Sequence, residues 1–320
     1  MRAKPDMEAG GGPQGATVAS VTYRLPAEGL RGAITTYYLV KVSGPGTVRD
    51  QIFPEWPNFR MILSGRWDAQ FPEQPPEQLP TNGMSGALER ALWVEGSAGL
   101  IVGVGLMPQG WPRLTTQPAD AFTNRLAPLA EVLGPVAEDL YRRLQAAAAD
   151  GGGDEALYTV LDEVLSAILR DFAETDLVAA AHAALQDPGV HSVSDWAGAL
   201  GLSSRQLERV SMKHFGLSPK RLLRRQRLLR TLAAMRETDE GTWTQALDGQ
   251  FTDQAHFIHE FSYYMGATPG QYLARPQPIM GEAWKRRKAL LGSPVQVLQP
   301  PTDARSLTRA RWGQAESPDR

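Results

Sequence analysis

The side chains best suited to chemistry in this sequence are cationic and lie close together along the chain. Residues 204–236 contain ten Lys and Arg and one acid, Glu208, which gives a net charge of +9. Such a segment suits a polyanion, because neutralising phosphates releases their condensed counterions. The alternative, a solvated helix face, would normally mix both signs. The segment therefore indicates nucleic-acid binding.

The rest of the chain distributes its charge differently. Residues 1–189 hold 14 Lys and Arg against 23 Asp and Glu, a net charge of −9, whereas residues 190–275 carry +3 and residues 276–320 carry +4. The length of 320 residues, 42% of them hydrophobic, is sufficient for two globular domains. We infer that a basic domain is joined to an acidic one.

Residues for covalent or metal-dependent catalysis are scarce. The chain has no cysteine, which excludes disulfides and thiolate metal sites and fits a reducing cytosol. Residues 1–181 contain no histidine, and no serine there has the setting of a nucleophile elbow. His256 and His259 have the spacing of a metal pair, but no third ligand lies near them in the sequence. We expect no catalysis, metal or cofactor.

Membrane and export signals are absent from the pattern. No apolar run approaches the roughly 20 residues that span a bilayer, and residues 1–15 lack the hydrophobic stretch of a signal peptide. We therefore expect a cytoplasmic protein without membrane contact.

The acidic half combines β-prone runs with helices. The runs, separated by Pro and Gly, cover residues 17–23, 34–42, 59–63, 91–94 and 100–106, a spacing typical of a small antiparallel barrel or sandwich. Apolar residues at helical spacing then predict two helices over 122–144, broken near Gly134 and Pro135, and another over 155–172. The pair over 122–144 either forms a dimer interface or packs against the barrel.

The basic half reads as short helices in a repeated arrangement. After a helix over 176–186, a second helix follows Ser192 and ends at Gly201, and Ser203 and Ser204 signal the start of a third. This is the pattern of a helix-turn-helix.

The same arrangement recurs after a longer helix that begins at Pro219. A short helix over 243–247, a turn at Gly249, a cap at Thr252 and Asp253, and a helix ending at Gly266 repeat the pattern. A connecting helix of about 18 residues would be roughly 27 Å long, close to the ~34 Å between successive major-groove faces.

Residues 190–275 resemble the DNA-binding domain of the AraC/XylS family of bacterial transcription regulators. The motifs that carry the resemblance are Ala197, LGLS at 200–203, LER at 207–209, FGLSP at 215–219, Arg227, FTDQAHF at 251–257, EF at 260–261 and GATPGQY at 266–272. Ser211, Thr231 and Gln245 stand where the family usually has apolar core residues, and Gln250 stands where it has a turn glycine. We expect looser packing there. The N-terminal half more weakly resembles the cupin-like sensor regions of some members.

The resemblance implies that the second helix of each unit enters the major groove. Its base-contact candidates are Arg205, Glu208 and Arg209 in the first unit and Gln254, Ala255, His256 and His259 in the second. Arg suits guanine, Glu suits cytosine and Gln suits adenine. The phosphate-contact candidates are Ser204 and Thr252, as helix caps, together with Lys213, Lys220, Arg221 and Arg224. Ordinary surface charge is the alternative for the Arg and Lys residues, and Arg227 is expected to bond a carbonyl or an acid such as Glu260.

Five aromatic residues of the acidic half are candidates for an effector pocket, with simple core packing as the alternative: Trp56, Phe59, Trp67, Trp93 and Trp111. Together these observations predict a sequence-specific transcription regulator that binds double-stranded DNA. A small-molecule effector, RNA polymerase and a second copy of the chain are its candidate partners. The alternatives are an interaction protein with a degraded helix-turn-helix and a cupin-type enzyme.

The predicted fold is α+β. Residues 1–16 are expected to be disordered, and residues 17–175 to form a β-rich, barrel-like sensor or dimerisation domain with helices at its end. Residues 176–275 form the all-α DNA-binding domain of two helix-turn-helix units joined by a long helix. Residues 276–320 are expected to be a basic, largely irregular tail, in which residues 285–288 either attract phosphate nonspecifically or are merely disordered.

Overall fold

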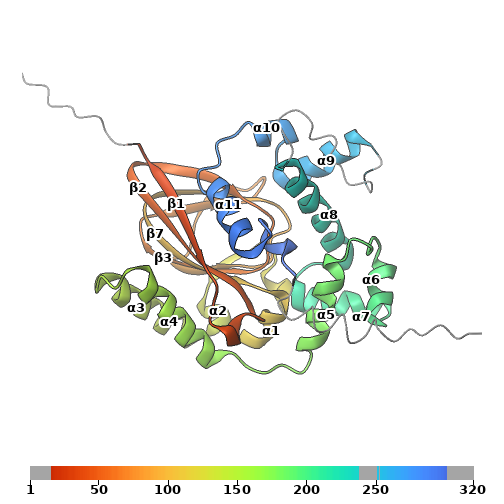
Figure 1. The fold of residues 1–320 in the computed structure, drawn as a ribbon, viewed down its shortest axis with the longest axis horizontal. Coiled ribbons are helices and arrows are strands. Elements are labelled where there is room, and N and C mark those ends of the chain that lie inside the picture. The colour runs from red at the N-terminus through yellow and green to blue at the C-terminus, as the bar shows by residue number, and fades with distance from the viewer. Residues whose placement is uncertain (1–15, 238–250, 252, 301–320) are drawn as a thin grey trace, which may run out of the picture.

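The structure of the protein, a computed structural model, describes residues 16–237, 251 and 253–300. Its N-terminal part is an antiparallel sheet. Over this part of the chain the sheet has eight strands in the order β1-β2-β7-β3-β6-β8, and β4 joins β7 to β5 (Figure 1). The strands are β1 (Val18–Arg24), β2 (Ile34–Ile52), β3 (Asn58–Ser64), β4 (Trp67–Gln70), β5 (Glu77–Gln78), β6 (Asn82–Ser85), β7 (Leu92–Leu106) and β8 (Leu126–Pro128).

Alternate residues of the long strands enter two different cores, because side chains on a strand point to opposite faces in turn. On β2, Tyr37 and Leu39 belong to one core, while Tyr38 and Val40 belong to the other. The runs predicted separately at 91–94 and 100–106 are one strand, β7. A Cβ at Gly103 of β7 would lie 2.0 Å from the Tyr38 ring, so glycine at this position allows Tyr38 to cross the sheet surface.

Helices cover one face of the sheet. They are α1 (Trp111–Leu114), α2 (Ala130–Leu133), α3 (Pro135–Ala149) and α4 (Gly153–Ile168), and α3 and α4 lie side by side across the sheet in Figure 1. The predicted break is confirmed at Gly134, which has φ +58. The helix expected from residue 122 is wrong up to Leu129, because this stretch forms a 3-10 turn and β8.

The apolar side of α3 faces the interior of the same chain. Leu140 and Leu144 are fully buried in the core that Leu161 and Leu165 of α4 also enter. Of the two roles considered for residues 122–144, the structure supports packing within the chain for this face.

The C-terminal part is helical. Its elements are α5 (Thr175–Gln186), α6 (Val193–Leu200), α7 (Ser204–Val210), a π-helical turn (Ser211–Phe215), α8 (Pro219–Met235), α9 (Gln254–Met265) and α10 (Pro269–Leu273). In Figure 1, α6 and α7 lie near one end of α8 and α9 lies near the other. The predicted helix at 243–247 and residues Gln245, Gly249, Gln250 and Thr252 lie outside the described residues.

The expectation of an irregular tail is wrong for residues 276–300. Helix α11 (Met280–Leu291) and a 3-10 turn (Gln296–Leu298) return to the sheet, and α11 lies over its second face (Figure 1). Its apolar residues Met280, Ala283 and Trp284 are four or fewer positions apart and are buried there. Residues 1–15 and 301–320, for which disorder or irregular structure was predicted, lie outside the described part.

One hydrophobic core joins the sheet to the helical part. Trp56 and Ile62 of the N-terminal part share it with Phe215, Leu222 and Tyr264. Backbone polar groups also cross the boundary: the Ala91 N–H donates to Tyr264 O at 2.8 Å, and Gln51 Nε2 donates to Met265 O at 2.6 Å. Within the described residues, no helix is both long and apolar enough for a bilayer span.

Candidate functional site

The first helix-turn-helix unit presents three charged residues to solvent. Reciprocal side-chain and backbone hydrogen bonds between Ser192 and Asp195 start α6, and Gly201, at φ +65, makes the turn. Ser203 caps α7 and pairs with Gln206 in the same way, so the prediction of Ser204 as the cap is wrong by one residue. Because Leu207 and Val210 point into the core, the base-contact candidates Arg205, Glu208 and Arg209 are exposed.

The second unit exposes a less charged helix. Asp253 caps α9 by accepting from the His256 N–H at 2.8 Å. Gln254, Ala255 and His259 are exposed. The His256 ring is half-buried, lies edge-on to Phe251 and has its Nε2 3.6 Å from Glu260. His256 is therefore less free to contact a base than its three neighbours. Among the described residues, no group of three or more His, Asp or Glu could hold a metal ion.

One face of α8 forms a basic groove with the start of α6. The groove encloses about 430 Å³ and is lined by His191, Lys220, Arg224, Arg227 and Arg230, among others. Arg224 Nε and Arg227 Nη2 each donate to the buried Glu260 carboxylate at 2.9 Å, which confirms the structural role expected of Arg227. Burial alone would raise the pKa of Glu260, but these two guanidiniums hold it below its ordinary value. Lys220, which also lines the groove, is exposed.

The opposite face of α8 is attached to the sheet. Arg225 is fully buried, with its guanidinium 4.1 Å from the centre of the Trp56 ring. Its Nη1 donates to Leu88 O at 2.8 Å and to Glu55 O at 3.3 Å. Burial lowers the pKa of Arg225 to about 9, which leaves it charged at neutral pH.

Besides Arg224, two further phosphate-contact candidates are already paired within the chain. Arg221, on the attached face of α8, contacts the buried Glu89 carboxylate at 3.2 Å. Lys213 lies 3.6 Å from Glu174 and over the ring of Phe172. Arg221 therefore does not share a face with Lys220 and Arg224.

The five aromatic pocket candidates do not line one pocket. Trp56 lies between the two parts of the chain, against His182, Phe215 and Arg225. The other four are dispersed. Phe59 and Trp111 are in the core beneath α3 and α4, the Trp93 ring contacts the guanidiniums of Arg49 and Arg275, and Trp67 lines a cavity between the sheet and α11. They are separated because they come from different elements, namely the β2–β3 connection, β3, β4, β7 and α1.

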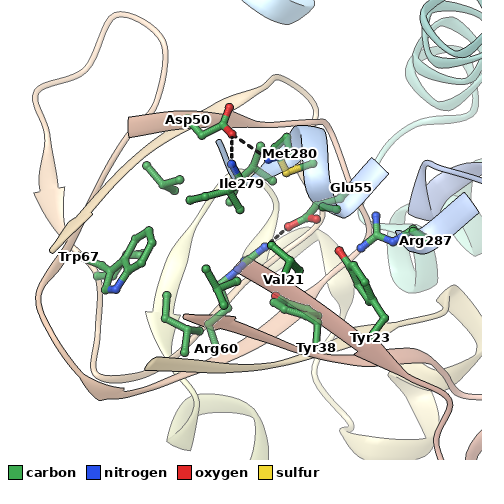
Figure 2. A pocket seen from close by; sticks show the side chains of 16 residues that line it. Val21, Tyr23, Tyr38, Asp50, Glu55, Arg60, Trp67, Ile279, Met280 and Arg287 are labelled. Carbon is green, nitrogen blue, oxygen red and sulfur yellow. Dashed lines mark hydrogen bonds and ion pairs between the residues drawn. The ribbon is translucent and has the colours of Figure 1, made fainter. Parts of the chain in front are cut away.

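The cavity under α11 measures about 60 Å³ (Figure 2). Most of its lining is apolar, and two carboxylates and two guanidiniums interrupt it. Glu55 forms an ion pair with Arg60, and Asp50 accepts from the backbone N–H groups of Ile279 at 2.8 Å and Met280 at 2.7 Å. Burial raises the pKa of Asp50, although these N–H groups oppose the shift.

The charged residues of this cavity were not predicted from the sequence. They come from β2, the β2–β3 connection, β3 and α11. Because Arg60 and Arg287 are far apart in the sequence, their spacing gives no sign that they line the same cavity. Only the abundance of Tyr and Val in β1 and β2 pointed to a buried surface there.

Comparison with known families decides the nature of the helical part. Residues 196–275 match the model of a family described as helix-turn-helix domain. These residues are an AraC-type helix-turn-helix domain. The resemblance expected from the sequence is thereby confirmed for this part of the chain. The AraC-type domain contains α6, α7, α8, α9 and α10 as described above.

Comparisons over the whole chain give weaker likenesses. No curated protein sequence matches the chain. A 1.65 Å structure of ToxT from Vibrio cholerae shows 13% identity and a TM-score of 0.38, covering 81% of this chain and 98% of that one. Unsaturated fatty acid-bound wild-type ToxT from Vibrio cholerae shows 11% identity and a TM-score of 0.37, covering 80% of this chain and 94% of that one. The AraC-like transcriptional activator CuxR shows 15% identity and a TM-score of 0.27, covering 71% of this chain and 91% of that one. At these scores the likenesses bear on neither the ligand nor the activity of this chain.

Proposed function

We propose that this protein is a cytoplasmic transcription regulator that binds double-stranded DNA through both units of its AraC-type domain. The observation that carries the proposal is the exposure of Arg205, Glu208 and Arg209 on α7 and of Gln254 and His259 on α9 within a domain of this family. These side chains offer donors and acceptors that match base edges in the major groove. No catalytic step is part of the proposal.

The basic groove supplies the sequence-independent part of binding. Lys220 and Arg224 lie on α8 between the two units, and Arg224 keeps more than a third of its side chain exposed beside Glu260. Contacts to phosphate position a protein on the duplex without reading sequence. We infer that this groove contacts the DNA phosphates that lie between the two major-groove insertions.

The N-terminal sheet is proposed to regulate the AraC-type domain through α8. Glu55 lies at the junction: its carboxylate pairs with Arg60 in the cavity, while its backbone carbonyl accepts from Arg225. A small effector or partner that moves Glu55 therefore changes how α8 is held. Such an effector acts by differential affinity for two arrangements of the same contacts.

The proposal is tested by mapping the bound sites of the protein across its genome and titrating the recovered sites in gel shifts. We expect binding to a shared sequence to exceed binding to scrambled duplex by at least about 10³-fold at the same salt concentration. Affinity that is equal for both duplexes would contradict sequence reading.

A second candidate, an interaction protein with a degraded helix-turn-helix, is favoured by one observation. Ser211 is fully buried, and its Oγ is among the buried polar atoms without a hydrogen-bond partner in the described chain. An unpartnered buried hydroxyl destabilises the fold by about 1–3 kcal/mol, which weakens the first unit. Equal affinity for all DNA sequences in gel shifts, together with binding of a protein partner to the α7 surface, would support this candidate.

A further inference from the structure

Strand β1 forms one edge of the sheet. Its pairing with β2 uses one side of its backbone from Val18 to Arg24. On the other side, no strand and no backbone hydrogen bond of the described residues meets it. The free N–H and C=O groups along an edge can pair with another extended chain unless neighbouring elements cover them. The surroundings of β1 therefore decide whether its edge can be used.

A groove of about 630 Å³ runs along this edge. Three consecutive residues, Thr22, Tyr23 and Arg24, line it, although neighbouring side chains on a strand point to opposite faces. Thr22 Oγ1 lies 3.2 Å from Tyr158 Oη of α4, whereas the Tyr23 ring contacts the Arg287 guanidinium of α11 at 4.9 Å. The backbone between these two side chains, which is the outer edge of β1, therefore forms the floor of the groove.

The two walls of the groove differ in character, and β1 passes between them in Figure 1. The α4 wall consists of Asp154, Glu155 and Tyr158, and the α11 wall of Arg286, Ala289 and Leu290. Glu155 pairs with Arg24 but keeps 74% of its side chain exposed, so its carboxylate can accept a second cation. On the opposite wall, Arg286 is paired with Glu282, and 39% of Leu290 is exposed. The groove thus has one acidic wall and one partly apolar wall.

The shape of the groove favours a single extended segment over a second copy of the chain. A dimer through two β1 edges would bring the α4 and α11 walls of each copy against those of the other, because each edge is the floor of its own groove. A lone strand enters between the walls without this collision. Its side chains would face the two walls in alternation, because the side chains of a strand alternate between its faces.

We propose that this groove binds an extended segment of a partner protein, in which Lys or Arg alternates with apolar residues, as an added strand on β1. The backbone of the segment pairs with the outer edge of β1 and supplies affinity, while the walls supply specificity. Its cations lie against Asp154 and Glu155, and its apolar side chains lie against Ala289 and Leu290. This inference does not depend on DNA recognition.

Strand addition is tested on the full chain with a fluorescein-labelled heptapeptide of alternating Lys and Val, by fluorescence anisotropy at about 150 mM salt, which screens nonspecific attraction. In an antiparallel strand, the N–H groups of alternate residues point to the same neighbour. N-methylation of one alternating set should therefore weaken binding at least about 10-fold, and N-methylation of the other set less than about 3-fold. Equal effects of the two methylated peptides, or no binding of the unmodified peptide, would overturn the proposal.

The apolar part of the α11 wall is tested with Leu290→Lys, which should weaken binding of the unmodified peptide at least about 10-fold, because an apolar contact is replaced by a like charge. The matched control is Leu273→Lys on α10, because Leu273 is similarly exposed, at 41%, and lies outside the groove. It should leave the affinity unchanged. Equal losses from the two changes would contradict binding in this groove.

The acidic wall is tested with Glu155→Gln, which should weaken binding at least about 3-fold because one carboxylate is lost. Its control is Glu163→Gln, two turns further along α4, where Glu163 pairs with Arg143 outside the groove. Equal affinities of these two variants would overturn the proposed partner chemistry. A wild-type dimer in sedimentation that Leu290→Lys dissociates would place a second copy in the groove and overturn the choice of occupant. No DNA is present in these measurements, so their failure is distinct from a failure of DNA recognition.

Discussion

Arg209 and its neighbours on α7 are exposed for a reason that lies in the helix period. Leu207 and Val210 take the buried positions, and the positions between them face solvent. A sequence is sufficient to predict this much. It is not sufficient to predict which charged residues find partners elsewhere in the chain, as Arg221 does with Glu89.

Arg209→Ala should weaken binding at the preferred site by about 1–3 kcal/mol and relax the preference at one base position, because the Arg fork is suited to guanine. The measurement is a gel-shift titration against the preferred site and its single-base variants. Arg142→Ala, an exposed change on α3 of the N-terminal part, serves as the control and should leave all affinities unchanged. An equal loss on every sequence would remove the specific role of Arg209.

His182 makes stability depend on pH. It is fully buried between Gln109 and Gln186, and burial, followed by the nearby charge of Arg225, lowers its pKa to about 3. Below pH 6.5 the His182 imidazole is protonated in the unfolded chain but stays neutral in the folded chain until the pH approaches about 3. The free energy of unfolding should therefore fall by up to about 1.4 kcal/mol per pH unit between pH 6.5 and about 3 through this residue.

The predicted loss of stability on acidification is tested by urea unfolding of the wild type and of His182→Gln across this pH range. The contributions of the other titratable groups cancel in the difference between the two proteins. The variant should show the smaller loss of stability on acidification. An independent measurement is the NMR titration of the His182 imidazole, which should remain neutral at pH 4.5. A midpoint near 6.5 would contradict the prediction.

At the scale of elements, α8 acts through two faces that neighbouring residues occupy. Lys220 and Arg224 face the basic groove, whereas Arg221 and Arg225 face the sheet. The helical period separates residues that are adjacent in sequence by about 100°, so equal charges have different roles.

Lys220→Gln should weaken binding to all DNA sequences alike and lower the magnitude of the salt slope by about 1, because one phosphate contact is lost. Arg221→Gln is the matched control on the same helix turn and should leave the salt slope unchanged, since Arg221 pairs with Glu89. The slope of log affinity against log salt concentration is measured on one duplex between about 50 and 200 mM salt, where affinity depends strongly on the number of phosphate contacts. Identical slopes for the two variants would refute the assignment.

Elements with strong local signals were predictable and others were not. Helix α8 was found because Ser218 and Pro219 mark its start and apolar residues recur along its length. Strands β4, β5, β6 and β8 have two to four residues each, too few for a period of two to stand out. The helix at 280–291 was missed because four consecutive cations at 285–288 obscured its buried side, which includes Arg287 itself.

At the scale of the whole molecule, the boundary between sheet and helices contains a buried charge. Arg225 is held by Trp56 and two backbone carbonyls from separate loops. None of these partners is predictable from sequence spacing, because residues 55, 88 and 225 are brought together only by the tertiary fold. The cavity residues were missed for the same reason.

Arg225→Met should lower the free energy of unfolding by about 3 kcal/mol, because two buried carbonyls lose a charged donor. Lys220→Met, an exposed change on the same helix, should alter it by less than about 0.5 kcal/mol. In the wild type, tryptophan fluorescence and far-UV circular dichroism should report one coincident urea transition, since both parts contribute to one core. Two separate transitions in the wild type would contradict a shared core.

The joint hydrophobic core has a consequence for protein engineering. Trp56 packs against Phe215, and the Thr123 hydroxyl of the N-terminal part donates to Gly216 O. The first helix-turn-helix unit is therefore completed by residues that lie far earlier in the chain, Thr123 by 93 positions and Trp56 further still. A chimera that grafts residues 176–275 onto a foreign sensor would expose Phe215 and Tyr264 to water. Only a transplant that also carries the sheet residues beneath them should yield a well-behaved hybrid regulator.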